Sequence, residues 1–205
     1  MRLPHWILSL VLLAFTAMQT VQAAPRYNVE IIVFQNYALK GWTEEFWPET
    51  HDSVTLENST SELSRQIAPL FISEAYQQID HLEDRLKSAG YGVVYHTAWQ
   101  QNAVNKRSTA TTRFEGGSGG TSVLGTLRLV KTKFEHIYLD MELSRVIPEK
   151  VRLAFAEQHK LHVDALPRSW NFKISEHRKI KPKEVHYIDH PLFGALVRIT
   201  EASAN

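Results

Sequence analysis

The sequence of 205 residues contains no cysteine. Disulfide bonds and a cysteine nucleophile are therefore both excluded. The fold must rest on an ordinary hydrophobic core, and a chain of this length is long enough to build one of useful size.

A strong net charge is also lacking, since 23 Lys and Arg residues stand against 22 Asp and Glu residues. Proteins that bind nucleic acid usually carry a clear basic excess, so this partner class is disfavoured. The same balance argues against tight electrostatic binding to anionic lipid. A neutral chain leads us to expect that ligand binding weakens little with salt.

Long apolar runs are absent except at the N-terminus. Arg2 precedes an apolar run over residues 7–15, and Val21 and Ala23 are small residues at the −3 and −1 positions of a cleavage site. This layout is typical of a secretory signal peptide. A membrane anchor would need about 20 apolar residues, which this run does not reach. We expect residues 1–23 to be removed after Ala23. We also expect a soluble periplasmic protein. A lipoprotein anchor is not expected, because it needs a cysteine just after the signal.

Motifs for catalysis and metal binding are missing as well. The sequence has no His-Glu-x-x-His zinc motif. Residues 116–120 spell Gly-x-Ser-x-Gly, but no strand leads into a helix there, as a nucleophile elbow requires. The glycine-rich residues 116–120 lack the lysine and hydroxyl of a phosphate-binding loop. His186 and His190 are four apart, but Pro191 disfavours the helix that this spacing would need. We expect no cofactor and no metal site.

The first half of the chain shows one strand, one helix and a second strand. Residues 27–35 are apolar on both faces, which indicates a central strand. Residues 36–69 form a long, irregular connection. Residues 73–89 have helical periodicity and are followed by the strand 91–99. The helix begins with a Ser73 cap, ends at Gly90, allows a Glu83–Lys87 pair, and has an apolar stripe made of Tyr76, Ile79, Leu82 and Leu86.

The second half is dominated by strands. Residues 100–122 lack periodicity and are predicted to be a flexible loop. Residues 135–143 alternate strictly, with one buried and one polar face. Residues 153–163 are ambiguous between helix and strand. The remaining elements are strands at 125–130, 170–180, 185–188 and 196–200, with a helical turn at 190–194.

This order predicts a single α+β domain over residues 24–205. A twisted, mainly antiparallel sheet would carry the helix on one face. The most economical topology is ferredoxin-like or a related two-layer sandwich.

Two tryptophans lie in the irregular connection beside acidic residues. If exposed, Trp42 and Trp47 could stack on sugar rings, because indole combines a large apolar face with a polar edge. The acidic neighbours Glu44, Glu45 and Glu49 would be the first place to look for paired carboxylates of a glycosidase. The structural alternative is that both indoles fold onto the core and the carboxylates are solvated.

Three stretches together resemble the CsiV family of periplasmic peptidoglycan-binding proteins. The first is the strand at 27–34 with the Glu-Glu-Phe-Trp of 44–47. The second is Leu-Gly-Thr-Leu-Arg-Leu at 124–129 leading into Phe-Glu-His-Ile-Tyr-Leu-Asp at 134–140. The third and most specific covers 176–194, with His-Tyr, Asp-His-Pro and Phe-Gly in order. Residues 100–122 do not take part in the resemblance. In Glu135-His136-Ile137, a more apolar residue than Glu135 is expected before the histidine.

The resemblance implies a non-catalytic protein that binds the glycan-peptide mesh. It also implies support of cell-wall synthesis through the outer-membrane lipoprotein activator of a class A penicillin-binding protein. It supplies no ligand-contacting residues. An envelope hydrolase and a pure protein adaptor remain as alternatives.

The block around residue 190 has two interpretations. In the structural one, Asp189 caps a turn fixed by Pro191, and Phe193 enters the core. In the functional one, His186, Tyr187 and His190 form a polar binding patch at a strand end. With Trp42 and Trp47, these are the candidate ligand-binding residues.

Overall fold

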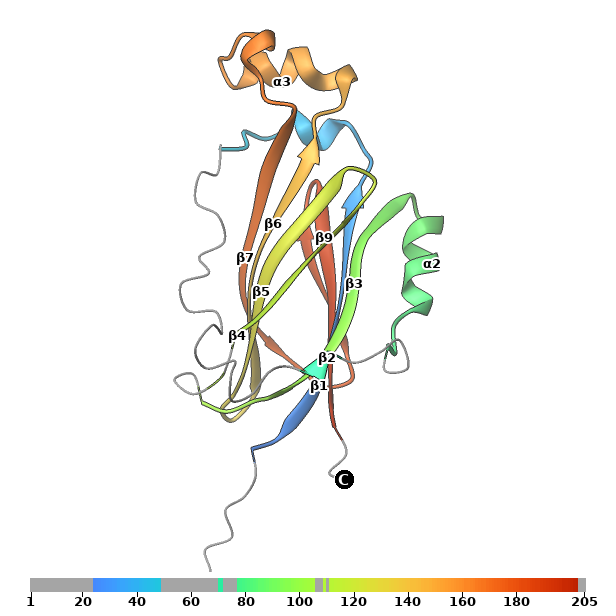
Figure 1. Ribbon diagram of the computed structural model, residues 1–205, viewed down its shortest axis with the longest axis vertical. Coiled ribbons are helices and arrows are strands. Elements are labelled where there is room, and N and C mark those ends of the chain that lie inside the picture. The colour runs from blue at the N-terminus through green and yellow to red at the C-terminus, as the bar shows by residue number, and fades with distance from the viewer. Residues whose placement is uncertain (1–23, 49–69, 72–76, 106–108, 110, 203–205) are drawn as a thin grey trace, which may run out of the picture.

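The computed structural model describes residues 24–48, 70–71, 77–105, 109 and 111–202. Within these ranges the chain forms two antiparallel sheets packed face to face (Figure 1). Sheet A has the order β2-β3-β1-β9-β8, and sheet B has the order β4-β5-β6-β7. No helix of the described part is both long and apolar enough to cross a membrane.

The strands are β1 (Arg26–Asn36), β2 (Leu70–Phe71), β3 (Tyr91–Asn102), β4 (Thr111–Ser118), β5 (Thr121–Lys131), β6 (Glu135–Val146), β7 (Ser169–Ile180), β8 (Val185–His190) and β9 (Phe193–Glu201). The α-helices are α2 (His81–Ser88) and α3 (Arg152–Gln158). Short 3-10 helices are η1 (Lys40–Trp42), η5 (Glu149–Val151) and η6 (Val163–Ala165). The α+β sandwich expected from the sequence is confirmed, with sheet B as the second layer.

The main core lies between the sheets, and a smaller one lies between sheet A and α2. The central strand β1 contributes side chains to both cores, as its two apolar faces predict. Ile31 belongs to the main core, whereas Ile32 and Phe34 pack in the smaller one with Ile79 and Leu196. On the other sheet, β6 alternates as expected and points Ile137, Leu139, Met141 and Leu143 inward.

Polar side chains join the two sheets at their margins. Tyr27 Oη of β1 donates to Glu135 Oε1 of β6 at 2.9 Å, and Lys131 Nζ also donates to that carboxylate. Burial and Glu135 raise the pKa of Tyr27 to about 12. Burial alone would raise the pKa of Glu135, but the hydrogen bonds from Lys131 and Tyr27 outweigh it and the pKa is lowered. These links fix the relative position of the layers.

In the described part of the chain, the helix predicted over residues 73–89 begins at His81 and ends at Ser88. Asp80, not Ser73, occupies the N-cap position, and its side chain accepts from the backbone N–H of His81. Ser73 and Tyr76 lie outside the described residues. The rest of the stripe packs on sheet A, with Ile79 buried and with Leu82 and Leu86 partly buried. Two predicted details are confirmed: the Glu83–Lys87 pair at 3.2 Å, and Gly90 with a φ of 86° after the helix.

The prediction of an irregular loop over 100–122 is wrong for most of that segment. β3 continues to Asn102, β4 covers Thr111–Ser118 and β5 starts at Thr121. The glycines serve a tight hairpin, because Gly119 and Gly120 have φ of 60° and 80°. Gly116 gives room to Tyr95, whose ring lies 2.1 Å from where a Cβ would stand. Residues 106–108 and 110 fall outside the described part.

Two further segments differ in detail from the sequence prediction. In residues 153–163, the segment 153–158 belongs to α3, and η6 begins at Val163. The helical turn expected at 190–194 is instead a tight link, Pro191-Leu192, between β8 and β9. Gly194 is required by close approach, since a Cβ there would lie 2.7 Å from Phe34. The connection at 36–69 opens with η1, and residues 49–69 are outside the described part.

Candidate functional site

The two tryptophans proposed for sugar stacking lie in the core. Trp42 is 0 % exposed, and its ring makes edge-to-face contacts with two phenylalanines. Its ring centre lies 5.5 Å from that of Phe155 and 5.1 Å from that of Phe172. Trp47 is 9 % exposed, and its Nε1 donates to the carbonyl of Gly41 at 3.0 Å. Neither indole has a free ring face, because both side chains are buried in the apolar core between the sheets. The expectation of exposed stacking residues is therefore corrected to the structural alternative.

His190 also belongs to the interior. Its ring lies 4.7 Å from those of Trp47 and Phe193, and its Nδ1 accepts from the backbone N–H of Leu192 at 3.2 Å. Burial lowers the pKa of His190 to about 4, so the imidazole is neutral near pH 7. His190, and not Asp189 as expected, caps the turn between β8 and β9.

His186 and Tyr187 do not complete a patch with His190. Successive residues of a strand point to opposite faces, so Tyr187 lies on the outer face of sheet A. It is 45 % exposed and stacks on Phe34 at 5.8 Å, and its hydroxyl donates to Asp189 at 2.8 Å. His186 Nε2 accepts from the backbone N–H of Lys181 at 3.0 Å. The three residues are neighbours in sequence but do not form one binding surface.

The acidic residues near Trp47 are surface groups. Glu44 is exposed and pairs with Lys40 at 3.2 Å. Glu45 is exposed, and its backbone carbonyl accepts from Gln158 at 2.7 Å. Glu49 falls outside the described residues. A general-acid carboxyl is normally placed in an apolar setting, which neither Glu44 nor Glu45 has.

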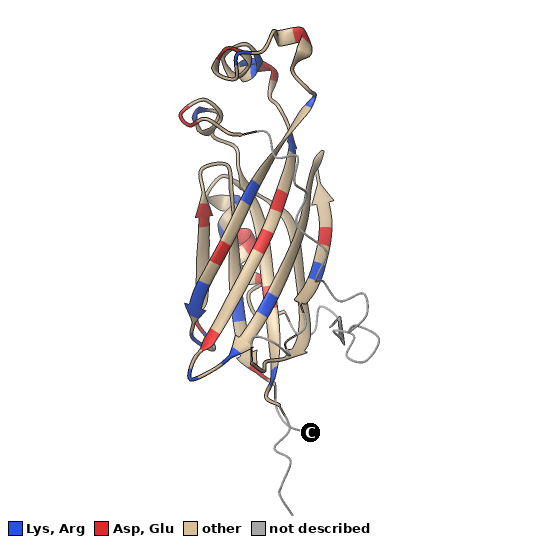
Figure 2. Cartoon of the chain, turned by 90° about the vertical axis from the view of Figure 1, so that its left-hand side faces the viewer, with Lys and Arg blue, Asp and Glu red and all other residues tan. Residues whose placement is uncertain are grey.

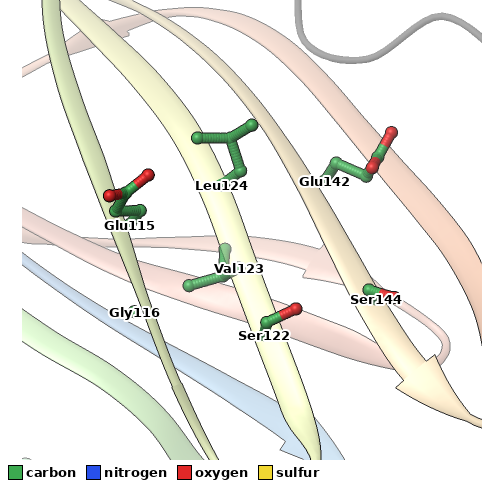
Figure 3. Close-up of a pocket in the computed structure, with 7 residues that line it drawn as sticks. All are labelled: Glu115, Gly116, Ser122, Val123, Leu124, Glu142 and Ser144. Atoms are coloured by element: carbon green, nitrogen blue, oxygen red, sulfur yellow. The ribbon is translucent and has the colours of Figure 1, made fainter.

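A hollow of about 330 Å³ opens on sheet B near the β4–β5 hairpin (Figure 3). Its two carboxylates come from different strands and flank Leu124. Glu115 is exposed and pairs with Arg113 at 2.5 Å, and Glu142 accepts from Asn171 at 3.0 Å. The lining is completed by Gly116, Ser122, Val123 and Ser144.

The outer face of sheet B carries an ordered row of polar and aromatic side chains. In the strand register, Arg128 of β5 is opposite Tyr138 of β6, which is opposite His177 of β7. The Arg128 guanidinium carbon lies 4.6 Å from the centre of the Tyr138 ring. The His177 ring is 4.1 Å from the same ring and almost parallel to it, with an angle of 7°. Three flat groups thus form a stack across the sheet, called here the sheet B stack.

Basic side chains lie next to the sheet B stack, near the start of β6 and the end of β7. His136 is one row away, with its ring 5.5 Å from that of His177, and it is opposite Lys179 in the register. Lys179 Nζ lies 3.2 Å from the ring centre of Phe134, which is 42 % exposed. Figure 2 looks onto this sheet and shows blue and red bands on neighbouring strands. The sheet B stack with Phe134, His136 and Lys179 forms the sheet B patch.

Sequence reasoning identified only part of this surface. The alternation over residues 135–143 correctly predicts that His136 and Tyr138 share a polar face. The partners from β5 and β7 could not be found, because the register between strands is not written in any one strand. The described residues contain no group of three or more His, Asp or Glu residues arranged to hold a metal ion.

Comparison with known protein families gives a match over most of the chain. The family model described as "Peptidoglycan-binding protein, CsiV" matches residues 6–202. No curated protein and no solved structure matches the chain. The family match includes β1, the β5–β6 hairpin and the β8–β9 hairpin that carried the resemblance. The chain therefore belongs to the CsiV family of peptidoglycan-binding proteins.

Proposed function

We propose that this protein is exported, loses residues 1–23, and binds peptidoglycan in the periplasm without altering it. The observation that carries the proposal is the family match over residues 6–202. The apolar run at 7–15, followed by Val21 and Ala23, supports export.

The placement of the buried acid–base groups supports a non-catalytic role. His96 is held between Glu83 at 2.6 Å and Glu30 at 2.9 Å. His159 contacts the backbone carbonyls of Phe155 and Trp47, at 2.8 Å and 2.7 Å. His190 closes a turn in the core. These imidazoles are committed to the fold, whereas a general base must reach a substrate proton.

Binding to sacculi and digestion of sacculi can be measured on the same sample. We expect the purified mature protein to co-sediment with sacculi and to release no soluble fragments. Release of fragments would establish the hydrolase alternative. The hollow on sheet B would then be the place to begin, with Glu115→Gln and Glu142→Gln replacing the earlier candidates near Trp47.

The proposed biological role is support of cell-wall synthesis and cell shape as an accessory protein. The partner implied by the resemblance is the outer-membrane lipoprotein activator of a class A penicillin-binding protein. A pull-down with the purified activator, with and without sacculi, tests this partner directly. Capture only when sacculi are present would contradict a direct contact, and capture with no binding to sacculi would favour the pure adaptor.

A further inference from the structure

We propose that the sheet B patch binds the carboxylate groups of peptidoglycan peptides, and that it does not stack on the sugars. This inference rests on the proposed function and names the part of the polymer that is recognised. The ligand chemistry follows from three features of the patch. These are its geometry, the lack of a carboxylate partner for its cations among the described residues, and its occupied aromatic faces.

The geometry holds Arg128 in place before any ligand arrives. Its guanidinium is stacked on Tyr138, and Tyr138 is stacked on His177 from the strand on the other side. Stacking uses the flat face of a guanidinium and leaves the N–H groups in its plane available to an acceptor. An arginine fixed in this way loses less conformational entropy when it binds a carboxylate.

The cations of the patch have no carboxylate partner within the described residues. Arg128 and Lys179 make contacts with aromatic rings but no ion pair. Some other surface cations are paired with acidic residues, as in Lys40–Glu44, Lys87–Glu83 and Lys181–Glu184. In the next row, the Asp140 carboxylate accepts from Ser175 Oγ at 2.5 Å. The patch is therefore locally cationic on a neutral protein and complements an anionic ligand.

The aromatic rings of the patch are poorly placed for sugars. A pyranose stacks on a free ring face, but both faces of Tyr138 are covered by Arg128 and His177. Lys179 lies over the Phe134 ring. The glycan of peptidoglycan is built of amino sugars, and its attached peptides end in and carry free carboxylates. Those groups meet the N–H donors of Arg128 and Lys179 as charge-assisted hydrogen bonds.

This assignment changes the expected salt dependence. Overall neutrality predicted binding that weakens little with salt, but contacts between cations and carboxylates at an exposed surface are screened. Binding through the sheet B patch should fall as ionic strength rises from low values to above physiological ones.

The test uses the full mature protein and three forms of sacculi. The first form is intact, the second has its peptides removed by an amidase, and the third keeps its peptides but has its carboxyl groups capped as neutral amides. The variant Arg128→Gln/Lys179→Gln is compared with wild type. Lys40→Gln/Lys150→Gln removes the same charge from exposed sites in η1 and η5 and serves as the matched control. Circular dichroism checks that each variant is folded.

We expect wild type and the control to bind intact sacculi alike, and Arg128→Gln/Lys179→Gln to bind at least about tenfold more weakly, as loss of charge-assisted contacts implies. Wild-type binding should drop by a similar factor on capped or peptide-free sacculi. Equal binding of wild type to all three forms, or wild-type affinity in the folded patch variant, would overturn the inference and leave the proposed function standing. Failure of wild type to bind intact sacculi would instead remove the proposed function.

Discussion

Two histidines in this chain experience opposite environments. The His96 side chain is 7 % exposed and touches the carboxylates of Glu83 and Glu30. Burial alone would lower the pKa of His96, but the hydrogen bonds to Glu30 and Glu83 outweigh it and the pKa is raised. His190 is surrounded by aromatic rings, and burial lowers its pKa to about 4. Their residue type is the same, so the tertiary contacts alone raise the pKa of one and lower the pKa of the other.

The lowered pKa of His190 predicts a loss of stability in mild acid. The unfolded chain, with a histidine pKa near 6.5, binds the proton more readily than the folded chain between about pH 6.5 and 4. Each tenfold difference in proton affinity corresponds to about 1.4 kcal/mol, so a pKa lowered from 6.5 to about 4 corresponds to a loss of about 3.5 kcal/mol. Partial solvent access reduces the expected loss to ~2 kcal/mol. Urea unfolding of wild type and His190→Gln from pH 7 to 4 measures this loss. The variant should lose less stability than wild type over that window, and equal slopes would contradict the assignment.

The position of Trp42 in the core predicts a large cost of truncation. Trp42→Ala should lower the free energy of unfolding by about 3–5 kcal/mol, because a fully buried indole leaves a cavity. Phe46, in the same segment but 62 % exposed, is the matched control, and Phe46→Ala should cost less than about 1 kcal/mol. Chemical denaturation measures both. Similar small losses in the two variants would mean that Trp42 is not a core residue.

Helix α2 is joined to sheet A by a buried polar contact. The helix has no fully buried residue of its own, and Leu82 and Leu86 are only partly buried on sheet A. His96 of β3 bridges Glu83 of α2 and Glu30 of β1, and the Glu30 carboxylate also accepts from the backbone N–H groups of Gln78 and Ile79. The start of the helix is thus attached to the sheet through charge.

Removal of the cation should loosen this helix. Below the ordinary histidine pKa, where His96 is protonated, His96→Gln leaves the buried Glu30 carboxylate without its positive partner, which costs about 3–5 kcal/mol in comparable buried pairs. Relative to wild type, His96→Gln should accelerate amide hydrogen exchange more in α2 than in β5 or β6. The pKa of His96 is raised in the folded protein. Its contribution to folding stability is therefore fully present below the ordinary histidine pKa and is lost as the pH rises through the raised pKa. Unchanged exchange in α2 would rule out His96 as the attachment.

The elements also show what local patterns can and cannot reveal. Periodicity correctly located β1, β6 and the stripe of α2, because one buried face imposes a period on the sequence. It failed at β4, where glycines that serve a hairpin and make room for Tyr95 were interpreted as flexibility. It could not bring Arg128, Tyr138 and His177 together, because strand register depends on long-range pairing.

At the scale of the whole molecule, the fold class and the family were accessible from the sequence. The candidate site was not: Trp42, Trp47 and His190 are interior residues, since a sandwich of two sheets has a large core to fill. Among the described residues, the outer face of sheet B carries a hollow and a cationic patch. This arrangement suits an extended polymer that lies along a sheet better than a small molecule enclosed in a cleft.

The proposed binding of intact peptidoglycan can be tested directly by co-sedimentation. The purified mature protein is mixed with sacculi and sedimented, and the supernatant is analysed by chromatography for released fragments. We expect saturable binding to sacculi and a supernatant identical to that of sacculi incubated alone. Protein that stays in the supernatant at all sacculus concentrations, or soluble fragments that increase with incubation time, would contradict it.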